Sequence, residues 1–201
     1  KYLFFIILSP VGPYYSQGFN PVKIMVSDKY VRAVPGGVGF AKTGGNYAAS
    51  ILAEKEAKEL GYTQVLWLDA VERRYIEEVG AMNIFFVIND EIVTPQLTGS
   101  ILPGITRMSV LELGKYLGLN VSARRISIDE VLKGLKVGSV TEVFGAGTAA
   151  VISPVGVLSY KEEEYQVGNG ETGPIANRFF EQLTGIQYGK EADPFDWVES
   201  F

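Results

Sequence analysis

Residues 83–95, NIFFVINDEIVTP, hold two apolar runs separated by an Asn-Asp pair. Aromatic and β-branched residues favour strands, and Asn and Asp tolerate the positive φ angles that a two-residue hairpin turn requires. The stretch therefore predicts a β-hairpin. On either side of it, further strands are predicted at 22–26, 29–34, 65–70 and 121–128, and a strand, a glycine-rich turn and another strand over 141–155.

Helical patterns alternate with these strands. Residues 46–60 place Tyr47, Ile51, Ala53, Ala57 and Leu60 roughly on one face. Three more helices are predicted: one at 107–118, one that begins with a Ser127–Glu130 capping box, and one that begins at Pro174. Mixed helices and strands indicate an α+β fold.

The first residues suggest a domain boundary. Residues 2–8, YLFFIIL, form a continuous apolar run typical of a buried strand, and residues 9–21 carry the Pro and Gly of a linker. We expect residues 1–10 to be the last strand of a preceding small domain, 11–21 an interdomain loop and 22–201 the main domain. A processed N-terminus is the alternative.

Composition excludes several function classes. The 201 residues carry a formal charge of −5, which gives no electrostatic footprint for nucleic acid or an anionic membrane. Cysteine and histidine are both absent, which removes disulfides, ordinary zinc sites and histidine-based triads. We expect a cytoplasmic protein that acts on small molecules, with no nucleic-acid or membrane partner and no metal.

Lys42 is the first candidate for chemistry. It lies in residues 36–47, GGVGFAKTGGNY, with glycines on both sides and no acidic neighbour in sequence. Glycines permit close backbone approach to a bound group, and a desolvated lysine becomes an amine nucleophile suited to Schiff-base chemistry. A solvated surface lysine is the alternative.

Three other motifs complement Lys42. The sequence Pro103-Gly104-Ile105-Thr106 opens a helix whose free N–H groups favour a phosphate. Glu78 could pair with the ring nitrogen of a Schiff-base cofactor such as pyridoxal phosphate, or it could be a turn carboxylate. The turn in FGAGTAA, residues 144–150, could hold a phosphate or a carboxylate, or be a tight hairpin.

In this order, KTGGNYAAS, EEVGAMNIFF, ILPGITR and FGAGTAA resemble the large C-terminal domain of branched-chain amino acid aminotransferases. These are pyridoxal 5'-phosphate (PLP) enzymes of fold type IV. The resemblance covers essentially the whole chain. It implies a mixed-sheet pseudo-barrel with flanking helices, without the family's small N-terminal domain.

The resemblance also implies site residues. Lys42 matches the lysine that bonds covalently to the cofactor and moves the substrate proton, and Glu78 matches the partner of the pyridine nitrogen. The other implied cofactor contacts are Tyr47, Leu102, Ile105, Thr106 and Thr148. The implied substrate contacts are Tyr14, Gly147, Thr148 and Ala149.

The implied reaction is transamination between leucine, isoleucine or valine and 2-oxoglutarate, which gives branched-chain 2-oxo acids and glutamate, as in branched-chain amino acid biosynthesis. A homodimer is implied for the full-length protein, and the 201-residue chain alone is expected to have little activity. The alternatives are a D-amino acid aminotransferase, an aminodeoxychorismate lyase, or a non-catalytic fragment that binds cofactor or a partner.

Overall fold

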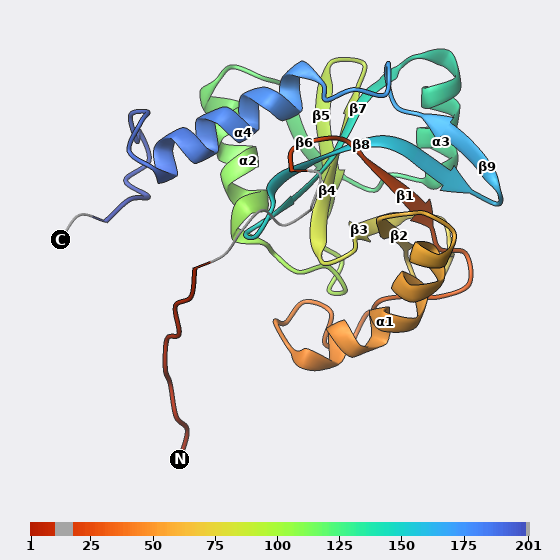
Figure 1. The fold of residues 1–201 in the computed structure, drawn as a ribbon, viewed down its shortest axis with the longest axis horizontal. Helices are drawn as coiled ribbons and strands as arrows, with labels where there is room; N and C mark the ends of the chain where they lie inside the picture. Colours follow the sequence, from red (N-terminus) through yellow and green to blue (C-terminus); the bar gives the residue numbers. More distant parts are fainter. Residues whose placement is uncertain (11–17, 200–201) are drawn as a thin grey trace.

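The computed structural model describes residues 1–10 and 18–199, which form nine strands and four helices (Figure 1). In chain order these are β1 (Val22–Val26), α1 (Gly44–Glu59), β2 (Gln64–Leu68), β3 (Ile76–Val79), β4 (Met82–Ile88), β5 (Glu91–Pro95), α2 (Ile105–Tyr116), β6 (Val121–Arg124), α3 (Ile128–Val137), β7 (Val140–Gly147), β8 (Val151–Tyr160), β9 (Glu163–Gln166) and α4 (Pro174–Gln187).

The sheet closes on itself. Hydrogen-bonded neighbours run β3–β2–β1–β8–β7–β4, and β4 pairs back to β3. Strands β5 and β6 continue from β4, and β9 pairs with β8. Strand β1 is parallel to β2 and β8, and β5 to β6, whereas the other pairs are antiparallel. The predicted α+β fold with a mixed-sheet pseudo-barrel and flanking helices is confirmed.

The predicted hairpin at 83–95 is formed by β4 and β5. Its turn residues Asn89 and Asp90 have φ angles of 49° and 63°, which is the left-handed pair that a type I′ turn needs. A second hairpin, β8–β9, has the same turn geometry at Lys161 (φ 51°) and Glu162 (φ 66°). We did not predict β9, because Lys-Glu carries no turn signal and its strand is polar.

Strand β4 is forked along one edge. Its first residues, Met82 and Asn83, pair with β3, whereas Phe86–Ile88 pair with β5. The opposite edge pairs with β7 from Asn83 to Ile88. Strands β3 and β5 therefore diverge from β4, and residues 96–104, which follow β5, bond to side chains of β3.

The helices cover the barrel at three places. Helices α2 and α4 lie together (Figure 1) and bury an aromatic cluster of Phe85, Phe144 and Phe179 against the sheet. Helix α3 packs on the main apolar cluster through Val131 and Leu132. The third contact is α1 on β2, which buries Ala53, Ala57, Val65 and Trp67.

The predicted apolar face of α1 is partly wrong. Ala53 and Ala57 are buried, together with Asn46 and Ser50, but Tyr47, Ile51 and Leu60 are exposed. Small side chains let the helix approach β2 closely, so the large ones point outward.

Two predicted strands are not formed among the described residues. Over 29–34 the chain bends, because the Ser27 hydroxyl bonds to both the N–H and the carbonyl of Tyr30, and Pro35 follows. Residues 1–10 have no strand partner, and the side chains of Tyr2–Leu8 are exposed (Figure 1). A strand needs a neighbouring edge, and none of the described strands supplies one to this run. The proposed domain boundaries stay a prediction, and residues 11–17 lie outside the described residues.

Two helix starts are confirmed, although the predicted capping box is only half formed, because the Glu130 carboxylate bonds to Arg124. The Ser127 hydroxyl accepts a hydrogen bond from Glu130 N at 3.1 Å, which caps α3, and Pro174 occupies the first turn of α4. The buried Glu142 carboxylate of β7 also accepts bonds from Ile175 N and Ala176 N, both at 2.9 Å. It therefore fixes α4 to the sheet and offsets the dipole at its N-terminus.

We predict that Glu142→Ala lowers the free energy of unfolding by about 2–3 kcal/mol, because two buried N–H groups lose a charged acceptor. Urea unfolding monitored by circular dichroism measures the change. Glu181→Ala, which removes an exposed carboxylate of α4 itself, should change the free energy of unfolding by no more than about 0.5 kcal/mol. Equal effects of the two substitutions would contradict this role for Glu142.

Candidate active site

Glu78 lies on β3 and is 3% exposed, so it is a strand residue and not a turn carboxylate. Its Oε1 accepts from Leu102 N at 2.8 Å and lies 3.4 Å from Asn83 Nδ2. Its Oε2 lies 3.0 Å from Arg32 Nε in an ion pair whose two side chains are both almost fully buried. We did not predict this strand, because its sequence IEEV contains two adjacent glutamates and glutamate is disfavoured in strands.

Arg32 was missed by sequence reasoning. Its Nη2 donates to the carbonyls of Ser100 and of Gly39, the latter at 3.4 Å. A Cβ at Gly39 would collide with the backbone of Ser100, so this glycine is required for packing. A single arginine in VRAVPGG gave no signal of its partner, because Glu78 is distant in sequence.

The side chain of Asn83 connects β4 to the segment before α2. Its Nδ2 donates to the Leu102 carbonyl at 2.9 Å, and a Cβ at Gly104 would collide with its Oδ1. Gly104 therefore permits the approach of the Asn83 side chain. In the sequence, this glycine was only part of a motif that opens a helix and favours a phosphate.

Burial raises the pKa of Glu78 to about 7 from its ordinary value of 4.5. Arg32, the Leu102 N–H and the Lys42 ammonium all oppose this rise. Because the folded-state pKa is the higher one, the stability that protonated Glu78 contributes is fully present below pH 4.5. It is lost as the pH rises through about 7.

Lys42 and Tyr47 flank the start of α1. Lys42 is exposed, contrary to the burial that we associated with a nucleophilic amine, and its Nζ lies 5.2 Å from the centre of the Tyr47 ring. Asn46 Nδ2 donates to the carbonyls of Val38 and Ala41, which holds the preceding loop. Gly44 and Gly45 border open space, so a group can approach the backbone beside Lys42.

The structure divides the predicted site residues between two hollows. Tyr47, Glu78 and Leu102 line a narrow one of about 20 Å³. Ile105, Thr106 and Thr148 line a wider one of about 460 Å³, between the start of α2 and the end of α4. Residues 102–105 connect the two hollows.

The remaining predicted residues have different positions. Gly147 and Ala149 adjoin Thr148 at the β7–β8 turn, and a Cβ at Gly147 would lie 2.9 Å from Met82 Cγ. Tyr14 lies outside the described residues. The β7–β8 connection is a hairpin, as the alternative interpretation of FGAGTAA required, and its Thr148 side chain is exposed.

A family model described as amino-transferase class IV matches residues 1–157. The chain belongs to the class IV aminotransferase family. It is 59% identical to branched-chain-amino-acid aminotransferase 2 of Bacillus subtilis, over 98% of the chain and 54% of the relative. It therefore spans about half the length of the curated relatives that it matches.

Solved structures agree with this assignment. The chain superposes on the Escherichia coli branched-chain amino acid aminotransferase with a TM-score of 0.82 at 35% identity, covering 96% of this chain and 60% of that one. A second match is to a T.th. branched-chain amino acid aminotransferase complexed with N-(5'-phosphopyridoxyl)-L-glutamate. Its TM-score is 0.73 at 32% identity, and the match covers 89% of this chain and 56% of that one.

The described residues contain neither a helix that could span a membrane nor a cluster that could bind a metal ion. Over 1–10 and 18–199, no helix combines the length and the apolar character needed to cross a membrane. In the same residues, no cluster of three or more Asp, Glu, His or Cys side chains could hold a metal ion.

We predict that Glu78 titrates near pH 7 and that Lys42→Met raises its midpoint, because the Lys42 ammonium favours the ionised carboxylate. Carbon-13 NMR of the glutamate side-chain carboxyl groups measures the midpoint, with Glu78→Gln assigning the signal. Lys55→Met, which removes an exposed lysine of α1, is the matched control and should leave the midpoint unchanged. A Glu78 midpoint near 4.5 would contradict the effect of burial.

Proposed function

We propose that this chain is the cofactor-binding part of a PLP-dependent aminotransferase that acts on branched-chain L-amino acids and 2-oxoglutarate. The observation that carries the proposal is the Glu78 carboxylate, which is buried beside Tyr47 and is influenced electrostatically by Lys42. The names of the Bacillus subtilis and Escherichia coli relatives support the substrate class. The phosphopyridoxyl-glutamate complex of the second solved structure supports the cofactor and the glutamate product.

The residues present fit the cofactor. A buried carboxylate suits a protonated pyridine nitrogen, and the pKa of Glu78, raised by burial to about 7, would fall when a positive charge lies beside it. The open space at Gly44 and Gly45 leaves room beside the amine of Lys42. Arg32, Asn83 and the Leu102 N–H fix the orientation of the Glu78 carboxylate before anything binds.

When bound, PLP withdraws electrons from the substrate Cα and so acidifies its proton. In this proposal Lys42 would hold the cofactor covalently through its amine and, once the substrate amine has displaced it, the free Lys42 amine would carry that proton as general base and acid. Glu78 keeps a proton on the ring nitrogen. The Tyr47 hydroxyl and the Leu102 side chain orient the ring.

The second hollow suits the phosphate. The first N–H groups of a helix have no intrahelical acceptor, and the helix dipole favours an anion beside them. In α2 these groups belong to Ile105 and Thr106, and Thr148 lines the same hollow. Gly147, Thr148 and Ala149 would face the substrate carboxylate at the β7–β8 turn, with Tyr14 completing the pocket.

The proposal includes the assembly and its setting. A preceding small domain would contribute cationic and aromatic side chains that cover the cofactor, and two copies of the complete protein would form a homodimer in the cytoplasm. Residues 1–10 would then be the last strand of that domain, since their exposed apolar side chains call for a partner.

We predict that sodium borohydride treatment of the PLP-loaded protein fixes a pyridoxyl group on Lys42 Nζ. Reduction converts a lysine–pyridoxal adduct to a stable secondary amine, and peptide mass analysis locates it. Lys55→Arg should leave the labelling unchanged, whereas Lys42→Arg should abolish it. Modification of another lysine in the unaltered protein would refute the assignment of Lys42.

We also predict that the 201-residue chain alone is nearly inactive and binds PLP weakly. A helix N-terminus contributes only about 0.3–2 kcal/mol toward an anion, less than a charge-assisted arginine contact adds. The test measures leucine–2-oxoglutarate transamination and cofactor affinity for this chain and for a version extended by a preceding domain. Comparable values would show that these residues suffice, and a screen of amino donors would test the substrate class separately.

A further inference from the structure

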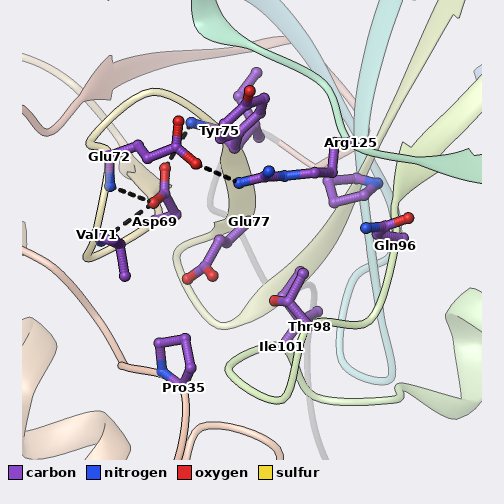
Figure 2. A pocket seen from close by; sticks show the side chains of 12 residues that line it. Pro35, Asp69, Val71, Glu72, Tyr75, Glu77, Gln96, Thr98, Ile101 and Arg125 are labelled. Carbon is purple, nitrogen blue, oxygen red and sulfur yellow. Dashed lines mark hydrogen bonds and ion pairs between the residues drawn. The ribbon is translucent and has the colours of Figure 1, made fainter.

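A third cavity, separate from the two hollows of the candidate site, lies on the other side of β3 from the Glu78 carboxylate. Successive side chains of a strand point to opposite faces, and Glu77 lines a cavity of about 190 Å³ bounded by the loop after β2 and residues 95–101 (Figure 2). A water molecule occupies about 30 Å³ of liquid, so the cavity has room for a ligand of several heavy atoms.

Most charged groups of this cavity already have partners. Both Asp69 carboxylate oxygens accept backbone N–H bonds, from Val71, Glu72, Arg74 and Tyr75, at 2.7–3.1 Å. The Arg125 guanidinium bonds to Glu72 at 2.9 Å and stacks 3.5 Å from the Tyr75 ring centre (Figure 2).

Glu77 is the exception. It is 3% exposed, its Oε1 accepts from the Ser100 hydroxyl, and its Oε2 is buried without a hydrogen-bond partner among the described residues. Figure 2 shows the carboxylate pointing into the space between Val71 and Ile101. Burial raises the pKa of Glu77, and the hydrogen bond from Ser100 and the positive charge of Arg32 oppose this rise. The nearby Thr98 hydroxyl opposes this rise, but it bonds to Ser100 at 3.0 Å.

The walls indicate the ligand. Three carboxylates (Asp69, Glu72 and Glu77) and one guanidinium (Arg125) line the cavity, so the net charge of its lining is negative and favours a cation. Pro35, Val71 and Ile101 supply apolar surface around Glu77. An unpaired buried carboxylate is best satisfied by a charged N–H donor.

We propose that this cavity binds a small aliphatic ammonium compound, with the Glu77 carboxylate accepting a hydrogen bond from its –NH₃⁺ group and the apolar walls holding its hydrocarbon body. The site is separate from the one that contains Lys42 and Glu78, and it does not depend on the function proposed for them. The ammonium can belong to a simple amine or to an apolar amino acid, whose carboxylate would meet Arg125 at the mouth.

The test is isothermal titration calorimetry of the full chain, free of aldehyde cofactor, with 3-methylbutylammonium chloride and, separately, with L-leucine. We expect saturable binding of at least one probe and a loss of roughly tenfold or more in affinity for Glu77→Gln, because a charged hydrogen bond is removed. Glu59→Gln removes one exposed carboxylate from α1 and should leave the affinity unchanged.

A second variant protects the test against misfolding of Glu77→Gln. Val71 is 77% exposed and lines the cavity, so Val71→Trp should fold and block it, with a similar loss of affinity. Failure of both probes to bind, or equal affinity in the unaltered chain and in a folded Glu77→Gln variant, would overturn the proposal.

Discussion

The buried ion pair between Arg32 and Glu78 is the constraint on which the rest of the site depends. A buried charge without a partner is strongly destabilising, so the two side chains must meet although they come from segments far apart in the chain. Arg32 also donates to the carbonyls of Gly39 and Ser100. The pair therefore holds the Lys42 loop, β3 and the segment before α2 in one arrangement.

This arrangement requires glycine at two positions. Gly39 and Gly104 both stand where a Cβ would collide with a neighbour, the first against Ser100 and the second against Asn83. Glu77 belongs to the same network, because Ser100 donates its hydroxyl to Glu77 and its carbonyl accepts from Arg32. The two adjacent glutamates of β3 thus lie on opposite faces and are connected through Ser100 and Arg32.

Much of the fold could be predicted from local signals, and most of the misses concern contacts over long sequence distances. The Asn89–Asp90 turn, the Ser127 cap and Pro174 each act within a few residues, so their elements were found. Strand β3 was missed, because its two glutamates are stabilised by Arg32 and Ser100, which no window around residue 78 contains. The apolar face of α1 was misjudged for a related reason. Alanine and serine are buried there because α1 packs closely on β2, and hydrophobicity alone does not reveal that.

The candidate site divides in the same way. Lys42 and Glu78 could be proposed from their chemistry, whereas Arg32 and Asn83 orient Glu78 and have no motif of their own. The division of the site between two hollows could not be predicted from the sequence either. It depends on how the sheet places α2 and the β7–β8 turn, which bring Thr106 and Thr148 to one hollow although they are far apart in sequence.

The forked strand β4 has a consequence for motion. Its amides and carbonyls are shared among β3, β5 and β7, so β4 cannot slide by one residue without breaking three ladders together. Local opening of a protein begins where few such bonds must break at once. Hydrogen exchange at β4 should therefore be among the slowest in the chain, and Asn83, at the branch point, should keep its position.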